Sequence, residues 1–152
     1  MTNLIPTEKI IERLRYENPW WVTKEIPKTY SSMSKRLYFD LFYPYVLERN
    51  VNRALVLMGP RRVGKTVMLF HCIEDLLNEG TNPQKLFFIG IDNPIYVNLG
   101  LEDILSLCKE SLALENLNGC YVFFDEIQYL KDWERHLKVL VDSYPETKFI
   151  VS

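Results

Sequence analysis

The hydrophobic pattern of this chain changes at about residue 53. Before that point, apolar residues recur at helical spacing in two segments, 7–16 and 34–49. After it, short continuous apolar runs alternate with longer amphipathic segments. Continuous apolar runs are typical of strands buried on both faces, and their alternation with helices is typical of a parallel sheet covered by helices. We therefore expect an α/β fold.

The second part of the chain is predicted to contain four strands and three helices. The strands are the apolar runs 53–58, 85–91, 121–124 and 148–151. The helices between them are the segments 65–79, 102–115 and 132–142. Gly80 is expected to close the first of these helices in a left-handed conformation.

Residues 1–33 are predicted to be a leader with one short helix, and residues 34–152 to be the core domain. Asn18 should end the leader helix, because a residue before proline avoids helical angles. The paired Trp20 and Trp21 suit a membrane interface or a platform for stacked bases, but we favour simple packing of the leader onto the domain. The neighbourhood of Asn18 is also a hypothesis for the contact with a nucleotide base.

The segment 34–49 is predicted to be an amphipathic helix that leads into the first strand, with a kink or break at Pro44. Its apolar side chains are expected on one face of the helix. They are Leu37, Leu41, Phe42, Tyr45 and Val46.

The strongest chemical signal is a glycine-rich loop between the first strand and the helix after it. Its sequence Gly59-Pro60-Arg61-Arg62-Val63-Gly64-Lys65-Thr66 matches the phosphate-loop pattern GxxxxGK[ST]. The glycines let backbone amides turn inward around a phosphate, and the helix adds the positive end of its dipole. We expect all eight residues, and Val67 after them, to bind the cofactor.

Two side chains of this loop carry specific roles. Lys65 places a positive charge between the β- and γ-phosphates, so it is also a catalytic candidate, and the Thr66 hydroxyl is a ligand of Mg²⁺. Arg61 and Arg62 occupy the variable middle of the loop, and we assign them no catalytic role.

A second signal is the apolar run 121–124 followed by Asp125 and Glu126, which matches a Walker B sequence. Ligands bind at the carboxyl ends of parallel strands, where these carboxylates are expected. Asp125 would hold the magnesium, and Glu126 would orient and polarise the attacking water. A second carboxylate favours hydrolysis over transfer to another substrate, so a small-molecule kinase is the weaker reading. GTP is disfavoured because the chain has neither DxxG after the loop nor NKxD.

The composition excludes some classes of protein but does not identify a binding partner. The 152 residues are 47% hydrophobic and 25% charged, with a formal net charge of −2, so no overall basic field attracts nucleic acid. No apolar run is long enough to span a membrane, and nothing resembles a secretory signal. The three cysteines are widely spaced and odd in number, which favours buried thiols in a reducing cytoplasm over disulfides or zinc.

GPRRVGKT, VFFDEIQ and the ENPWW segment together resemble a group of bacterial and archaeal AAA-superfamily ATPases that join such a domain to a C-terminal region. The resemblance implies a three-layer P-loop fold with strand order 5-1-4-3-2. It implies phosphate and metal contacts for Gly59, Gly64, Lys65 and Thr66, a magnesium contact for Asp125 and a water contact for Glu126. Ser152 falls near the sensor-1 position of such domains.

The fifth strand, the arginine finger and the lid helices of this family are missing from the sequence. We therefore expect an N-terminal part of a larger ATPase that binds ATP with Mg²⁺ and hydrolyses it, with a homo-oligomer or a C-terminal partner domain completing the site. The alternative is a non-catalytic, nucleotide-gated regulatory or interaction module associated with DNA. Nucleic acid as a partner is left undetermined.

Overall fold

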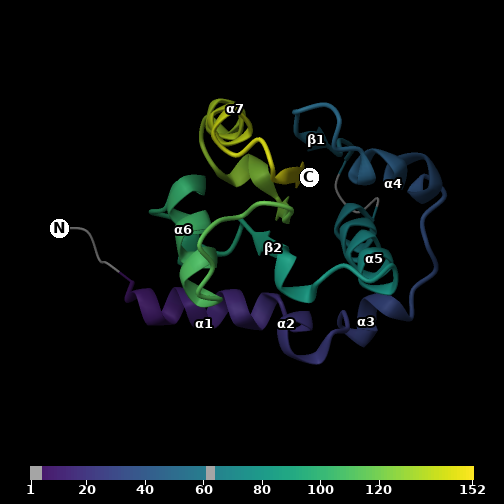
Figure 1. Cartoon of the computed structure of the whole chain (residues 1–152), viewed down its shortest axis with the longest axis horizontal. Helices are drawn as coiled ribbons and strands as arrows, with labels where there is room; N and C mark the ends of the chain where they lie inside the picture. Colours follow the sequence, from purple (N-terminus) through teal and green to yellow (C-terminus); the bar gives the residue numbers. More distant parts are fainter. Residues whose placement is uncertain (1–4, 61–63) are drawn as a thin grey trace.

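The computed structural model describes residues 5–60 and 64–152, which form a parallel sheet flanked by helices (Figure 1). The strands are β1 (Leu55–Val56), β2 (Leu86–Gly90), β3 (Tyr121–Asp125) and β4 (Lys148–Val151). Their order across the sheet is β1-β4-β3-β2, and every pairing is parallel. The α/β class is confirmed, and β4 lies between β1 and β3 as the resemblance implied.

The helices follow the strands in the expected alternation, preceded by short leader helices. Their bounds are α1 (Thr7–Glu17), α2 (Trp20–Thr23), α3 (Lys28–Ser31), α4 (Phe39–Leu47), α5 (Lys65–Asn78), α6 (Leu101–Ser111) and α7 (Trp133–Ser143), with single 3₁₀ turns at Pro83–Lys85, Pro94–Tyr96 and Ile127–Tyr129. Gly80 follows α5 with φ of +94°, as predicted. In the described part, no helix has the length and apolarity needed to cross a membrane.

The outer edge of β2 is covered by side chains of the leader. Asn18 pairs with the backbone of Phe88 in both directions, since Nδ2 donates to the carbonyl at 2.9 Å and Oδ1 accepts from the amide at 2.6 Å. The indole nitrogens of Trp20 and Trp21 both donate to the Leu86 carbonyl, at 2.9 and 2.8 Å. An edge strand otherwise presents unpaired backbone groups to other chains, so these contacts close that side of the sheet.

Trp20 and Trp21 also belong to the core, because both are buried. Trp20 packs edge-on against Phe70 of α5, and Phe70 stacks on Phe88 of β2 with ring centroids 4.4 Å apart. This confirms that the paired tryptophans pack the leader onto the domain. Cys72, Cys108 and Cys120 are free and buried, also as expected.

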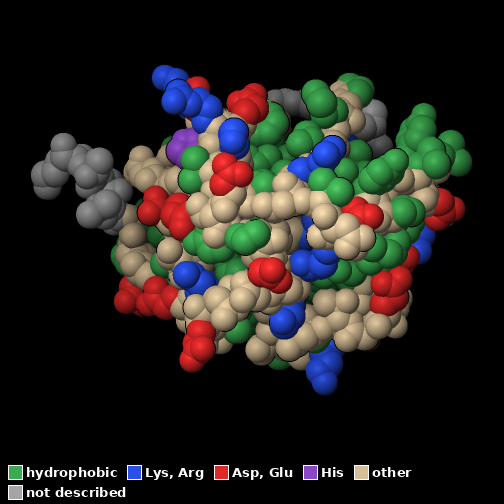
Figure 2. All heavy atoms as spheres, turned by 45° about the horizontal axis from the view of Figure 1, so that its top comes forward, with side chains coloured by type: hydrophobic (Ala, Val, Ile, Leu, Met, Phe, Trp, Pro, Cys, Tyr) green, Lys and Arg blue, Asp and Glu red, His purple; other side chains and the backbone are tan. Residues whose placement is uncertain are grey.

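α4 differs from the prediction in its apolar face. Phe39, Phe42, Tyr43 and Val46 are buried, whereas Leu37, Tyr38, Leu41 and Tyr45 of the same segment are exposed. The helix is therefore apolar on two faces and begins later than predicted, and Pro44 lies inside it without ending it. Figure 2 shows hydrophobic side chains gathered at the right of that view, the side on which Figure 1 places α4.

Candidate functional site

The loop between β1 and α5 begins and ends with a glycine in a conformation that other residues rarely adopt. Gly59 has φ of +152°, and Gly64, which caps the start of α5, has φ of +87°. Arg61, Arg62 and Val63 of the predicted phosphate loop lie outside the described residues. Pro60 is exposed, and Val67 is buried in the first turn of α5.

Lys65 closes this loop by folding its side chain back across it. Its Nζ donates to the Gly59 carbonyl at 2.6 Å, which joins the first glycine of the loop to the first residue of α5. The ammonium is thus held over the loop, at the positive end of the α5 dipole. A positive charge in this place suits an anionic ligand.

Three elements bring polar side chains together around the carboxylate of Asp125, at the end of β3. The Thr66 hydroxyl at the start of α5 donates to Oδ2 at 2.7 Å. The Ser152 hydroxyl, directly after β4, donates to Oδ1 at 2.5 Å. The contacts join residues 59 and 27 positions apart in the sequence. The carboxyl ends of β3 and β4 and the start of α5 therefore meet at one point.

Burial raises the pKa of Asp125 above its ordinary value. The two hydroxyl donors oppose this shift by stabilising the carboxylate, whereas the nearby charges of Glu126 and Asp92 add to it. A buried carboxylate among other carboxylates is a place where a cation would be stabilised.

Asp125 and Thr66 offer one carboxylate and one hydroxyl oxygen side by side, which are hard donors that suit Mg²⁺. Within the described ranges, no cluster of three or more His, Cys, Asp or Glu side chains could hold a metal by itself. Magnesium commonly takes one or two protein ligands and completes its shell with waters and substrate phosphates. The pair thus fits a magnesium that arrives with a phosphate ligand.

Glu126 stands next to this cluster in the left-handed region, with φ of +56°. Such a conformation costs free energy in a non-glycine residue and is common at functional sites. Its Oε2 accepts a hydrogen bond from Nε2 of Gln128 at 2.5 Å. Gln128 therefore fixes the direction of the Glu126 carboxylate.

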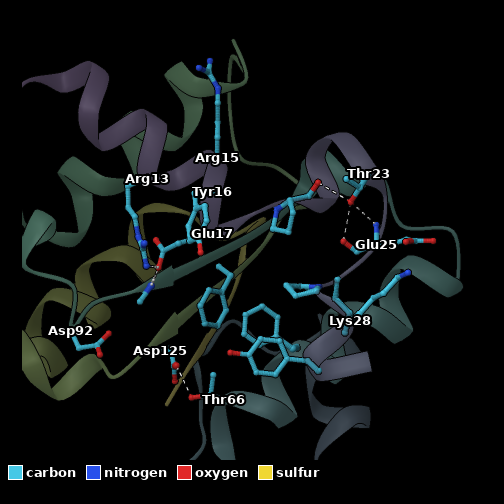
Figure 3. A pocket seen from close by; sticks show the side chains of 17 residues that line it. Arg13, Arg15, Tyr16, Glu17, Thr23, Glu25, Lys28, Thr66, Asp92 and Asp125 are labelled. Carbon is cyan, nitrogen blue, oxygen red and sulfur yellow. Dashed lines mark hydrogen bonds and ion pairs between the residues drawn. The ribbon is translucent and has the colours of Figure 1, made fainter. Parts of the chain in front are cut away.

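A cavity of about 810 Å³ adjoins Thr66 and Asp125 (Figure 3). It lies between the leader and the carboxyl ends of β2 and β3, with Arg13, Arg15 and Lys28 among its lining residues. Glu17 also lines it and accepts hydrogen bonds from the Gly90 amide, at 3.1 Å, and from the Tyr96 hydroxyl. Burial raises the pKa of Glu17. The sequence pattern did not indicate this cavity.

The predicted contact with a nucleotide base concerns the neighbourhood of Asn18 and the two tryptophans. Their polar atoms bond the outer edge of β2, and the side chains of Asn18, Trp20 and Trp21 are buried. Pro19, which lies between them, lines the cavity beside Thr66 and Asp125, so a base contact of this neighbourhood stays a prediction.

Arg36 is a residue beside the loop that the sequence reasoning missed. A Cβ atom at Gly64 would lie only 2.2 Å from Nε and 2.7 Å from Cζ of Arg36, so the guanidinium lies directly against the last glycine of the loop. Arg36 is exposed and precedes α4. A single arginine in an exposed segment has no periodicity or motif that would identify it.

The sequence profile of one protein family, described as the AAA domain, matches residues 51–152. An uncharacterized protein of Methanocaldococcus jannaschii is 30% identical over 92 residues, which are 60% of this chain and 19% of that protein. The chain thus spans about a fifth of the length of the curated relative that it matches. No solved structure matches the chain.

Proposed function

Because the chain belongs to the AAA domain family, we propose that it binds ATP with Mg²⁺ and is the catalytic part of an ATPase. The observation that carries the proposal is the 2.7 Å hydrogen bond from Thr66 Oγ1 to Asp125 Oδ2. This bond joins the end of the GxxxxGK[ST] pattern to the acidic end of β3. This contact between the two patterns supports their assignment to one site.

The loop would hold the phosphates through its backbone and Lys65. Gly59 and Gly64 adopt positive φ angles, so the amides between and after them can face a phosphate. Lys65 would exchange its 2.6 Å bond with the Gly59 carbonyl for phosphate oxygens. The positive end of α5 favours the same negative charge.

Thr66 and Asp125 would hold the magnesium, which when bound neutralises charge on the β- and γ-phosphates. Ser152 keeps the Asp125 carboxylate in place through its 2.5 Å bond to Oδ1, which leaves Oδ2 directed toward Thr66. The three side chains come from separate elements, so the site depends on how α5, β3 and β4 are placed relative to one another.

Glu126 would position the attacking water and accept its proton. Its carboxylate is oriented by Gln128 and lies one residue beyond Asp125, at the same end of β3. A general base must lie within hydrogen-bond reach of the water that it activates, and a carboxylate held in one direction meets that need.

Two substitutions test the proposal by separating binding from turnover. Lys65→Ala should abolish ATP binding measured by calorimetry, because it removes a charge from the phosphate site. Glu126→Gln should retain binding and stop phosphate release, because it removes only the base. Equal ATP affinity of the wild type and Lys65→Ala would refute the phosphate-loop assignment. Binding without turnover, in this chain and in the longer protein, would favour the nucleotide-gated module.

The cavity beside Thr66 and Asp125 favours a second candidate function, phosphoryl transfer to a small acceptor. Arg15 and Lys28 line the cavity and would offer positive charge to such an acceptor, whereas Arg13 is paired with Glu17 at 3.6 Å, and Asp92 also lines the cavity. Turnover in ¹⁸O-labelled water distinguishes the two functions. Hydrolysis puts one labelled oxygen into the released phosphate, whereas transfer to an acceptor leaves the γ-phosphoryl group unlabelled.

A further inference from the structure

Arg36 occupies a place from which it can reach a ligand of the phosphate loop. Its guanidinium lies against Gly64, at 2.2 Å from where a Cβ would stand, and Gly64 is the residue that caps α5. The side chain therefore lies at the start of the helix.

The segment before Arg36 is tied to α5 by two further contacts. The Tyr30 carbonyl lies 2.8 Å from Nε2 of His71, a buried residue in the middle of α5. Lys35 donates to both oxygens of Asp75 near the end of α5, at 2.8 and 2.9 Å, and its ammonium lies 4.5 Å from the centre of the Phe39 ring. These contacts point Lys35 toward the end of the helix, while Arg36 reaches its start.

The charge at this place is uncompensated in the described part of the chain. The ion pairs among the described residues involve Arg13, Lys35 and Lys138. None of them joins a described carboxylate to Arg36. Arg36 lies against Gly64 at the positive end of α5, and Lys65 is the next residue in the chain after Gly64. Two cations beside a helix N-terminus repel one another unless an anion lies between them.

We propose that Arg36 is a second phosphate-binding cation of the nucleotide site, contributed by the segment between α3 and α4 and acting with Lys65 on the phosphate chain of a nucleoside triphosphate. This inference rests on the proposed function. A guanidinium can donate two parallel hydrogen bonds to phosphate oxygens, which Lys65 cannot do. Arg36 would thereby couple the segment between α3 and α4 to the bound nucleotide.

The test compares the binding of MgATP and of inorganic tripolyphosphate, measured by calorimetry. Arg36→Ala should weaken the binding of both ligands by about tenfold or more, because the loss of a hydrogen bond to a charged group costs at least about 1.4 kcal/mol, the equivalent of a factor of ten. Arg36→Lys should fall between, since it keeps the charge and loses the fork. Arg135→Ala, which removes an exposed arginine from α7, is the matched control and should change neither affinity.

Free guanidinium ion at millimolar concentration should restore part of the affinity of Arg36→Ala and leave the wild type unchanged, which a purely structural role would not produce. The inference is overturned if Arg36→Ala binds both tripolyphosphate and ATP as tightly as the wild type does. It is also overturned if the substitution weakens only the binding of ATP. In those outcomes Lys65→Ala still abolishes binding. If instead the wild type binds neither ligand, the proposed function itself fails.

Discussion

Thr66 Oγ1 and Asp125 Oδ2 lie 2.7 Å apart although 59 positions separate them in the sequence. We expect Thr66→Val to reduce the gain in ATP affinity that Mg²⁺ provides, because valine keeps the shape and loses the oxygen. The loss should be about tenfold or more, since contacts to charged groups contribute roughly 1.5–3 kcal/mol. Thr66→Ser retains the hydroxyl and should behave like the wild type. Calorimetry with and without Mg²⁺ checks this, and equal magnesium dependence in all three proteins would contradict it.

The buried carboxylate of Asp125 is expected to reduce the stability of the protein without ligand. Burial raises its pKa, so holding it ionised near neutral pH costs free energy that Asp125→Asn removes. We expect Asp125→Asn to raise Tm by a few degrees in the absence of nucleotide and to abolish the further rise that MgATP gives the wild type. Asp92→Asn removes an exposed charge from the same end of the sheet and should change Tm less. A lower Tm for Asp125→Asn would count against this account.

Gln128 is expected to act on turnover through Glu126. Gln128→Ala removes the 2.5 Å hydrogen bond that directs the Glu126 carboxylate, and it should lower kcat by roughly tenfold or more, as misplaced catalytic groups do. ATP affinity should stay unchanged, because Gln128 contacts Glu126 and is not proposed to bind the phosphates. Steady-state phosphate release and calorimetry separate the two quantities. Gln84→Ala, at an exposed position outside the site, serves as the control.

The sequence predicted those features of the fold that are set by residues close together in the chain. The strands at 86–90, 121–125 and 148–151 and the helix after Gly64 follow from continuous apolar runs and from the loop pattern. β1 is shorter than the predicted 53–58, since only Leu55 and Val56 pair with β4 as a strand. α2 and α3 are single turns, too short to show a helical period.

The candidate site was predictable where a motif covers it and unpredictable where a contact joins distant segments. Lys65, Thr66 and Asp125 are identified by their patterns, and the structure brings the last two together. Arg36 and Gln128 act, in our proposals, through contacts that no spacing rule encodes. The pattern was misleading for α4, since an exposed apolar residue such as Leu41 looks the same in a sequence as a buried one.

Asn18 offers a sharp test of how the leader stabilises the fold. Asn18→Asp is nearly isosteric, but the introduced carboxylate would face the carbonyls of Phe88 and Leu14, to which Nδ2 now donates at 2.9 and 2.7 Å. We expect a loss of roughly 2–4 kcal/mol in the free energy of unfolding at pH 7, because buried backbone groups lose their partner. Part of it should return on acidification, when the carboxyl group can donate. Urea unfolding at the two pH values measures this, and a pH-independent loss would contradict it.

Glu17 should give the stability of the protein an unusual pH dependence. Burial raises its pKa above the ordinary value of 4.5, so the folded protein keeps a proton that the unfolded chain releases. The stabilising contribution is present below about pH 4.5 and is lost as the pH rises through the raised pKa. Glu17→Gln should therefore flatten the fall in stability over this window.

The matched control for this prediction is Glu12→Gln, which removes the same charge from an exposed position of α1. The urea midpoint of each protein, followed from pH 4 upward, provides the comparison. Parallel pH profiles for the wild type and Glu17→Gln would show that the carboxyl group does not titrate in the expected direction.

The hydrogen bonds from Asn18, Trp20 and Trp21 to β2 make one outer edge of the sheet less accessible to a further strand than the other. A strand that joined beside β2 would first have to displace the leader from Leu86 and Phe88. β1 is the other outer strand of the sheet in the described residues. An added strand therefore has its place beside β1, and β1 runs directly into the loop that begins at Gly59. A strand that joined there would act through the backbone of β1 on the loop that we propose binds phosphate.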